Sequence, residues 1–370
     1  DSVAKSTKKI RLKQEVIETL ETATMPFIAR DEEIPSSFQN SPESVETVAV
    51  QERYQIIETL GQGGMGVVQR VQDCILGREV ALKKLNLGLL GLNGSSPKQK
   101  MLLWRLHREA EITAVLEHPN IVPLYDMQKN SQGELFFTMR KVEGETLNAI
   151  LRKKRKTSNE EYDESRLLSV FFKVCDAVSY AHARKIVHRD LKPDNIMVGK
   201  FGEVYVLDWG IAKKLEEREE EYEEEKEEAL TESSFPKIST KLLHTSDFKT
   251  IGGIGTIGYM SPEQSESANA VVPESDIYAL GIILRQMYTL LSPIEEIYAT
   301  KKEPEAPLSK STKKLPIHKL VPSEIQAIVD KATEAQGSKR YRTVEAMVSD
   351  INRYLNHGRV SAKEYNLLEI

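Results

Sequence analysis

Cysteine is scarce in this chain of 370 residues. The two that occur, Cys74 and Cys175, lie about a hundred positions apart, and neither has a CxxC partner or a metal-ligand neighbour. This spacing argues against a disulfide framework and against a cysteine-based metal site. Reduced thiols fit a reducing compartment, so we expect a cytoplasmic protein.

Long apolar runs are also missing. The best candidate, residues 277–291, is interrupted by Arg285 and Gln286, so it falls short of the ~18 apolar residues that indicate a membrane-spanning helix. We therefore expect no membrane segment in this chain. No secretory signal is visible, but the sequence begins at Asp1 rather than Met, which fits a fragment of a longer protein. The sequence leaves open whether a membrane anchor or a sensor domain lies outside it.

Basic residues are not in excess. The formal net charge of −5 argues against a general nucleic-acid binder, although local runs of both signs occur. Hydrophobic residues make up 40% of the chain, enough for a sizeable core, which argues against wholesale disorder. The length favours about two domains or one large bilobed domain.

Residues 1–50 are polar and carry three prolines, so we expect a flexible N-terminal arm. Their one apolar stripe, Leu12, Val16, Ile17 and Leu20, spans about two helical turns and is too short to be stable alone. The alternative is a segment that docks on another surface.

The sequence from residue 51 predicts an α+β fold, in which a β-rich part, 51–143, precedes a larger helical part, 144–357, and a tail, 358–370. Apolar alternation predicts a small antiparallel sheet that carries one helix, and helical periodicity dominates afterwards. The first part has expected strands at 54–60, 67–72, 79–85, 121–125 and 134–141, and an expected helix at 101–116. The second part has expected helices at 166–183, 275–290, 322–334 and 343–355, and short strands at 196–198 and 204–207.

The stretch from His188 to Asn195 reads HRDLKPDN, and Asp208-Trp209-Gly210 follows thirteen positions later. Asp190 can orient an attacking hydroxyl, and Lys192 can neutralise charge on a transferred phosphoryl group. Asn195 and Asp208 can hold a divalent metal. The alternative, a solvated charged turn beside a strand, is disfavoured by the length of the motif.

Residues 61–68 fit G-x-G-x-x-G-x-V, which alone is a weak signal because a dinucleotide-binding turn has similar spacing. Here Val67 and Val68 continue as a strand rather than a helix, so we expect a glycine hairpin whose N–H groups approach nucleotide phosphates. The expected loop residues are Gly61, Gln62, Gly63, Gly64, Met65 and Gly66.

Val80-Ala81-Leu82-Lys83 lies on the third expected strand and matches V-A-I-K with one conservative change. Lys83 would contact the α- and β-phosphates of a nucleotide. Glu109, on the expected helix, is its best partner. Glu111 is the alternative, but it lies about 200° further round the helix and so on a different face.

With these motifs in this order, residues from about 54 to 357 resemble the eukaryotic-like (Hanks-type) protein kinases. Lys192 and the stretch GTIGYMSPEQ, 255–264, resemble serine/threonine rather than tyrosine kinases. That stretch and Trp209 particularly resemble the bacterial PknB/PknD-like group. The resemblance implies a bilobed kinase fold, ATP with Mg²⁺ or Mn²⁺, protein substrates with serine or threonine acceptors, and self-association for trans-autophosphorylation.

The resemblance also implies roles for further residues. Thr256 would sit beside Asp190 and Lys192, Glu263 would pair with Arg340, and Asp276 would hold the catalytic-loop backbone. Nucleotide contacts would come from Val68, Ala81, the gatekeeper Met139, and the hinge residues Arg140 to Val142. The pattern departs at Trp209, which replaces Phe, and at Ser261, which replaces Ala. The helix usual after residue 290 is poorly marked between 292 and 315.

Residues 214–250 form an expected acidic insert in the activation segment, with ten Glu between Glu216 and Glu228. A solvated tether and docking on the basic run 152–156 are both open. Arg189, which precedes Asp190, predicts control by activation-segment autophosphorylation, with Thr250 as the leading site and Thr245 and Ser246 next.

Two rival functions are a pseudokinase scaffold and a small-molecule kinase of related fold. The pseudokinase is disfavoured because the full set of expected reactive residues is present: Lys83, Glu109, Asp190, Asn195 and Asp208. The small-molecule kinase is disfavoured by residues 255–264.

Overall fold

The computed structural model describes residues 53–62, 66–86, 97–157, 161–215, 256, 258–266, 270–301 and 321–365. The expected N-terminal arm, the tip of the glycine loop at 63–65 and the acidic insert beyond residue 215 lie outside these ranges. So do the three expected phosphorylation sites. The described residues all belong to one compact unit, Ala49–Ile370.

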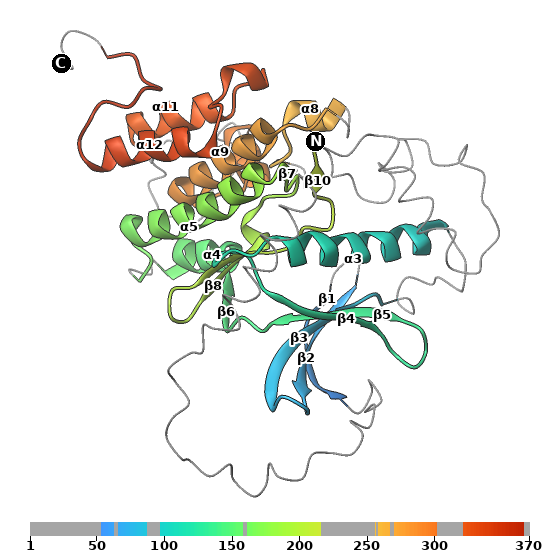
Figure 1. Ribbon diagram of the computed structural model, residues 1–370. Coiled ribbons are helices and arrows are strands. Elements are labelled where there is room, and N and C mark those ends of the chain that lie inside the picture. Colours follow the sequence, from blue (N-terminus) through green and yellow to red (C-terminus); the bar gives the residue numbers. More distant parts are fainter. Residues whose placement is uncertain are drawn as a thin grey trace, which may run out of the picture. The chain divides into compact units, whose positions relative to one another are not determined.

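The first part of this unit is a five-stranded antiparallel sheet with the order β1-β2-β3-β5-β4. Its strands are β1 (Tyr54–Gln62), β2 (Val67–Asp73), β3 (Arg78–Lys84), β4 (Leu124–Lys129) and β5 (Leu135–Arg140). The helix α3 (Pro97–Val115) lies against β4 and β5 (Figure 1). Side chains alternate along β3, so Val80 and Leu82 enter a core on one face of the sheet. Lys83 is left to the opposite face, toward α3.

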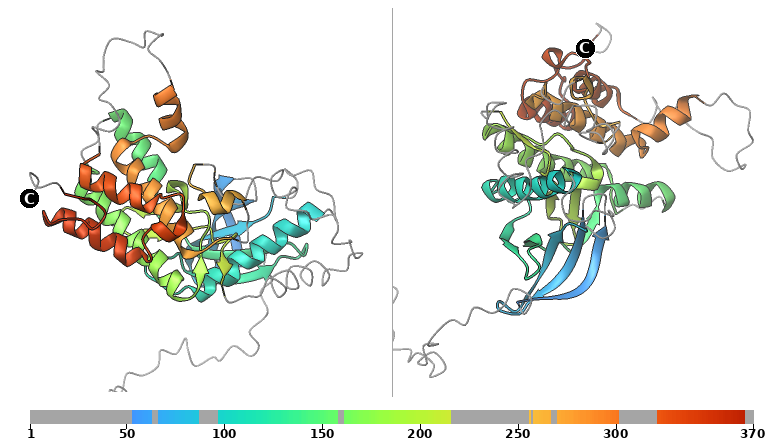
Figure 2. Two further views of the ribbon diagram at one scale, coloured as in Figure 1. Left: turned by 90° about the horizontal axis from the view of Figure 1, so that it is seen from above. Right: turned by 90° about the vertical axis from the view of Figure 1, so that its right-hand side faces the viewer.

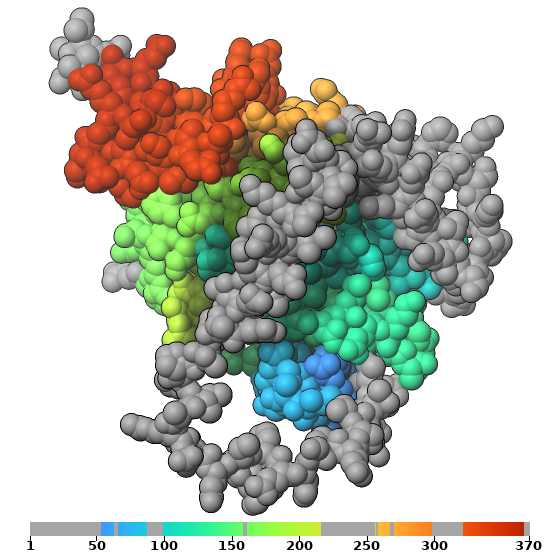
Figure 3. All heavy atoms as spheres, viewed as in Figure 1, coloured from blue at the N-terminus to red at the C-terminus, as the bar shows by residue number. Residues whose placement is uncertain are grey.

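The second part is mainly helical. Its helices are α4 (Leu147–Thr157), α5 (Glu164–Ala183), α8 (Pro262–Glu266), α9 (Pro273–Thr289), α10 (Pro293–Lys301), α11 (Ser323–Ala332) and α12 (Val344–Leu355). The helices α5, α9, α11 and α12 pack on one another around a shared apolar core (Figure 2). In the space-filling view, β1–β3 in blue and α11–α12 in red occupy opposite ends of the visible face (Figure 3).

Short strands connect the sheet to the helices. β6 (Gly144–Thr146), β8 (Ile196–Gly199) and β9 (Val204–Val206) form a three-stranded sheet, and β7 (Ile186–Val187) pairs with β10 (Lys213–Lys214). A single 3-10 turn, Pro193–Asn195, leads directly into β8. The stretch from His188 to Asn195 therefore lies between β7 and β8, which belong to two different small sheets.

Helix boundaries follow local chemistry. Asp163 precedes α5, and its carboxylate accepts a hydrogen bond from the Arg166 amide at 2.8 Å. The Thr343 hydroxyl accepts from the Ala346 amide at the start of α12, at 3.2 Å. Both side chains satisfy amides that the helix cannot pair itself, which fixes where each helix begins.

The structure corrects two expectations. Strand four was expected at 121–125, but β4 begins at Leu124 and ends at Lys129. Ile121 is instead buried in the helical core and bridges to Val206, so its apolar character reflects packing outside the main sheet. The poorly marked region after α9 contains α10, whose start is held by hydrogen bonds between Ser292 and Glu295. In the described residues, no helix combines the length and apolarity that crossing a membrane requires.

Candidate active site

Lys83 on β3 and Glu109 on α3 form the contact between sheet and helix. The Lys83 Nζ lies 2.6 Å from both carboxylate oxygens of Glu109. Glu111, the alternative partner, instead lies 3.7 Å from His107 on an exposed face of α3. The helical phase therefore selects Glu109, which is 7% exposed.

Asp208 brings Lys83 into contact with the helical part, at 3.8 Å between Nζ and a carboxylate oxygen. Burial opposes the charge on Lys83, but Glu109 and Asp208 outweigh it and raise the pKa of Lys83 to about 12. Burial raises the pKa of Glu109, while the Lys83 ammonium opposes that rise. Lys83 is therefore a fixed cation held between two carboxyl groups.

Asp190, Lys192 and Thr256 form a closed triangle. The Lys192 Nζ donates to Asp190 at 2.7 Å and lies 2.6 Å from the Thr256 hydroxyl. That hydroxyl in turn donates to the other Asp190 oxygen at 2.9 Å. The side chains of Asp190 and Lys192 are 12% and 20% exposed, so the carboxylate is fixed in position and still reachable. An entering hydroxyl would compete with Thr256 for the Asp190 oxygen.

Asn195 and Asp208 carry the oxygen atoms that a magnesium ion would need. The Asn195 amide nitrogen donates to the Asp190 carbonyl at 2.8 Å, which leaves its amide oxygen as a ligand atom. Burial opposes ionisation of Asp208, but Lys83, His188 and Lys192 lower its pKa on balance, so the group is an anion. One carboxylate and one amide oxygen suit Mg²⁺, which keeps waters and binds substrate phosphates as well. In the described residues, no cluster of three or more His, Cys, Asp or Glu side chains offers a closed metal cage.

The backbone of the catalytic loop is held by Asp276 of α9. Its carboxylate accepts from the amides of His188 and Arg189 at 2.8 and 2.9 Å, and it lies 2.8 Å from His182 Nε2. Arg189 has a φ of 73° and Asp208 has a φ of 63°, conformations that non-glycine residues adopt at a cost. The buried Asp276 therefore stabilises the strained backbone at Arg189.

Glu263 of α8 is paired with Arg340, as the resemblance implies. The two Arg340 end nitrogens donate to the two Glu263 oxygens at 2.7 and 2.8 Å, and the Arg340 side chain is fully buried. Burial opposes ionisation of Glu263, but hydrogen bonds from Arg340 and Ser275 lower its pKa to about 2. This bidentate pair fastens the end of the activation segment to the helical part.

The residues expected to contact a nucleotide lie on neighbouring strands. Ala81 on β3 is opposite Met139 on β5, and Val68 on β2 is opposite Lys83. A Cβ at Gly66 would lie 2.3 Å from the Lys84 carbonyl oxygen, so only glycine fits there. Gly61 and Gln62 end β1, whereas Gly63, Gly64 and Met65 lie outside the described residues.

The hinge has a feature that the sequence did not reveal. The Arg140 guanidinium lies 5.5 Å from the ring centroid of Tyr205 on β9, a cation–π contact across the two sheets. The Arg140 amide also donates to the Pro123 carbonyl at 3.0 Å, and Val142 is partly buried. The basic hinge residue is therefore held by an aromatic ring.

Two further side chains support the catalytic loop without having been predicted. The Gln264 amide donates to the Arg189 carbonyl at 2.9 Å, and His182 contacts Asp276. Both contacts join residues more than 70 positions apart. In the sequence, the only signal for Gln264 and His182 is that they lie near the two motifs at 255–264 and 188–195. Trp209, which stands where the family pattern has Phe, is fully buried with its ring 4.5 Å from that of His188.

Comparison with known proteins adds independent findings. A family model described as protein kinase domain matches residues 54–351. The chain is 37% identical over 314 residues to the serine/threonine-protein kinase PknD of Protochlamydia amoebophila, covering 82% of this chain and 30% of that protein. It is 35% identical to the protein of that name from Chlamydia caviae and 33% identical to the one from Chlamydia trachomatis serovar D, again over 82% of this chain. It spans 31% and 32% of those two proteins, so it covers about a third of the length of these curated relatives.

Proposed function

This chain belongs to the protein kinase family, and from that premise we propose that it transfers the γ-phosphoryl group of ATP to serine or threonine hydroxyls of proteins. The observation that carries the proposal is that Lys83 from the sheet meets Asp208 from the helical part, while Lys192, which pairs with Asp190, lowers the pKa of that same Asp208 carboxyl. Phosphoryl transfer needs positioned charge more than covalent chemistry from the protein, and this site supplies both signs.

Each side chain has a defined task in this reaction. The substrate hydroxyl donates its hydrogen bond to Asp190, which orients the oxygen and receives the proton as the new O–P bond forms. The bond from the γ-phosphorus to the bridging oxygen breaks, and ADP leaves. Lys192 lies beside Asp190 and stabilises the charge on the transferred group. The fixed Lys83 cation holds the α- and β-phosphates.

Asn195 and Asp208 would hold Mg²⁺, with Mn²⁺ as a substitute, and the ion would neutralise charge on the phosphates. Val68, Ala81 and Met139 would pack around the adenine, and the backbone from Arg140 to Val142 would read its edge. The glycine loop would cover the phosphates from above.

A transfer assay with labelled ATP, Mg²⁺ and a basic carrier protein tests the proposal. Changing Asp190 to Asn should lower turnover by roughly 10²–10⁴, because the amide cannot accept the proton. The matched control is Asp330→Asn on the exposed side of α11, which should transfer phosphate at the wild-type rate. An Asp190→Asn rate close to that of the control would contradict the assignment of Asp190.

We also propose regulation by autophosphorylation. Arg189 is directly joined to Asp190, is 8% exposed and is held at both ends of its backbone by Asp276 and Gln264. A phosphate near this guanidinium would therefore act on the backbone next to the acceptor-orienting carboxylate. Self-association would bring two activation segments within reach of each other's sites.

A further inference from the structure

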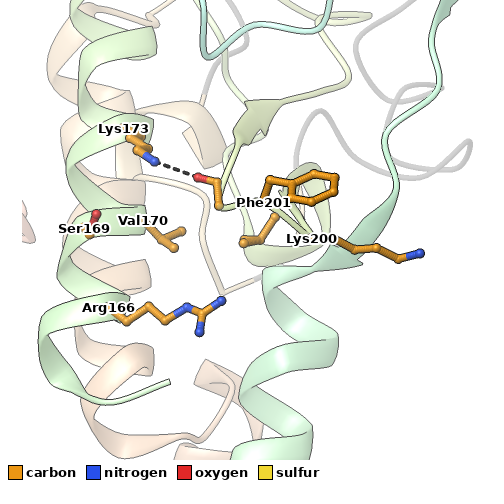
Figure 4. A pocket seen from close by; sticks show the side chains of 8 residues that line it. Arg166, Ser169, Val170, Lys173, Lys200 and Phe201 are labelled. Carbon is orange, nitrogen blue, oxygen red and sulfur yellow. Dashed lines mark hydrogen bonds between the residues drawn. The ribbon is translucent and has the colours of Figure 1, made fainter. Parts of the chain in front are cut away.

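A cavity of 420 Å³ lies between α5 and the turn that joins β8 to β9 (Figure 4). The residues that line it come from two segments that are about thirty positions apart. From α5 they are Arg166, Ser169, Val170 and Lys173, and from β8 and its turn they are Val198, Lys200, Phe201 and Gly202. None of these residues belongs to the proposed nucleotide or catalytic site.

The described lining residues carry three cations and no anion. Arg166 and Lys173 come from α5, and Lys200 comes from the turn. Three carboxylates lie beside the lining: Glu161 at 3.4 Å from Arg166, Glu143 at 3.5 Å from Lys200, and Glu203, which accepts a hydrogen bond from the Phe201 amide at 3.0 Å. The pairs of Arg166 and Lys200 are exposed, and such pairs contribute only about 0–1 kcal/mol, so a ligand carboxylate can replace Glu161 or Glu143.

The apolar part of this site is arranged in two layers. Val170 and Val198 are 4% and 3% exposed and belong to the helical core. Phe201 stands at the tip of the turn with 91% of its surface exposed, more than any other large apolar side chain in the described residues. Its exposed ring can pack on an apolar side chain of a ligand.

The turn is fixed before any ligand arrives. The Lys173 Nζ donates to the Gly202 carbonyl at 2.6 Å, and the Gly199 amide donates to the Glu203 carbonyl at 2.7 Å. Gly202 has a φ of +83°, which the tight turn requires and which other residues adopt at a cost. A site held in this way loses little conformational entropy on binding.

The cavity lies at a short, fixed distance along the chain from the catalytic loop. β8 begins directly after Asn195, and Lys200 to Gly202 follow five to seven residues later. At ~3.3 Å per extended residue, the turn lies up to roughly 16–23 Å from Asn195. A peptide held at the turn could therefore reach Asp190 through a short linker.

We infer that this cavity docks an acidic segment of protein substrates, with carboxylates on the Arg166 and Lys200 side and an adjacent apolar side chain on Phe201. The inference rests on the proposed kinase function. It assigns to the cavity a recognition role that is separate from the residues that react. Docking raises the local concentration of the acceptor hydroxyl, so it lowers KM and leaves kcat unchanged.

Binding tests the inference without any phosphoryl transfer. The probe is a fluorescein-labelled peptide with alternating Glu and Leu, compared with a Glu and Ser peptide of equal charge and with a Lys and Leu peptide. Wild-type protein should bind the Glu–Leu peptide more tightly than the other two. Phe201→Ala and Arg166→Glu should each weaken that binding at least about fivefold, which corresponds to about 1 kcal/mol. Lys129→Glu, an exposed charge reversal on β4, should leave it unchanged.

Kinetics then link the cavity to catalysis. The Glu–Leu sequence is joined to a serine acceptor peptide by about twelve Gly/Ser residues, whose root-mean-square span is roughly 19 Å. The docked substrate should have a KM at least about fivefold lower than the acceptor alone, and Phe201→Ala should remove that advantage at constant kcat. Unchanged rates on the undocked acceptor show that each variant is folded.

Two results overturn the inference: wild-type protein that does not prefer the Glu–Leu peptide, or variants that bind it as tightly as Lys129→Glu. Failure of the kinase proposal itself looks different. In that case neither substrate is phosphorylated, although the Glu–Leu peptide still binds at Phe201.

Discussion

At the scale of single residues, the ion pair of Glu263 with Arg340 allows a direct test of stability. Changing Glu263 to Gln leaves the buried guanidinium without its counter-charge but keeps one acceptor. We expect a loss of roughly 2–3 kcal/mol in the free energy of unfolding at neutral pH, below the ~3–5 kcal/mol of a fully lost buried partner. Urea unfolding of both proteins measures the difference.

The pH dependence of that difference has a definite sign. The folded pKa of Glu263 is about 2, lowered from 4.5, so the stabilisation is complete above about pH 4.5 and is lost as the pH falls toward 2. The difference in free energy of unfolding between wild type and Glu263→Gln should therefore be constant near neutral pH and should shrink below pH 4.5. Glu274→Gln, whose partner Arg342 is 71% exposed, is the control and should cost little at any pH. A gap that widens in acid would refute the ion-pair account.

Sequence alone could place the charged residues because their motifs have fixed spacing. Lys83 lies 3.8 Å from Asp208, Asp190 pairs with Lys192, and helical phase was enough to prefer Glu109 over Glu111. The contact of Arg140 with Tyr205 could not be predicted, because it joins two sheets that are far apart in the sequence. Such partners depend on packing, and no local pattern encodes them.

At the scale of elements, strongly periodic helices were predictable, and the expected helices at 166–183 and 343–355 end at the same residues as α5 and α12. The expected helix at 166–183 corresponds to α5, which starts two residues earlier because Asp163 caps it. α4 and α10 were not predicted, since the charged run 152–156 hides the apolar stripe of α4 and α10 carries exposed isoleucines. α4 does bury Leu147, Ile150 and Leu151 at helical spacing, whereas α10 is tied to its neighbours by ion pairs of Glu295 with Arg155 and of Glu296 with Arg285.

The basic residues of α4 allow a test of the docking hypothesis for the acidic insert. Lys153 already pairs with Glu145 at 2.6 Å and Arg155 with Glu295 at 2.9 Å. If Glu216 to Glu228 docks on this helix, Arg152→Glu with Lys156→Glu should raise the rate of proteolysis within the insert. Each exposed pair adds only about 0–1 kcal/mol, so ~1 M salt should remove the difference. Equal proteolysis of the variant and the wild type at low salt would leave the insert as a solvated tether.

At the scale of the whole molecule, the account predicts that the active protein phosphorylates its own activation segment. Mass spectrometry of protein incubated with ATP and Mg²⁺ should find phosphate at Thr250, and Thr250→Val should lower activity on an added substrate. The physical reason is the position of Arg189, which can pair with an added phosphate and is joined to Asp190. Active, autophosphorylated protein with no phosphate between Ser239 and Thr250 would contradict this prediction.

The most direct test of the central claim is calorimetric titration with a non-hydrolysable ATP analogue. The claim is that the two parts of the chain together hold a metal-bound triphosphate at Lys83 and Asp208. Wild-type protein should release heat that depends on Mg²⁺, and Asp208→Asn should bind at least about tenfold more weakly because the metal loses its carboxylate. Asp190→Asn should bind like the wild type, since Asp190 acts on the acceptor. Wild-type protein that gives no magnesium-dependent heat, or an Asp208→Asn titration identical to wild type, would contradict the account.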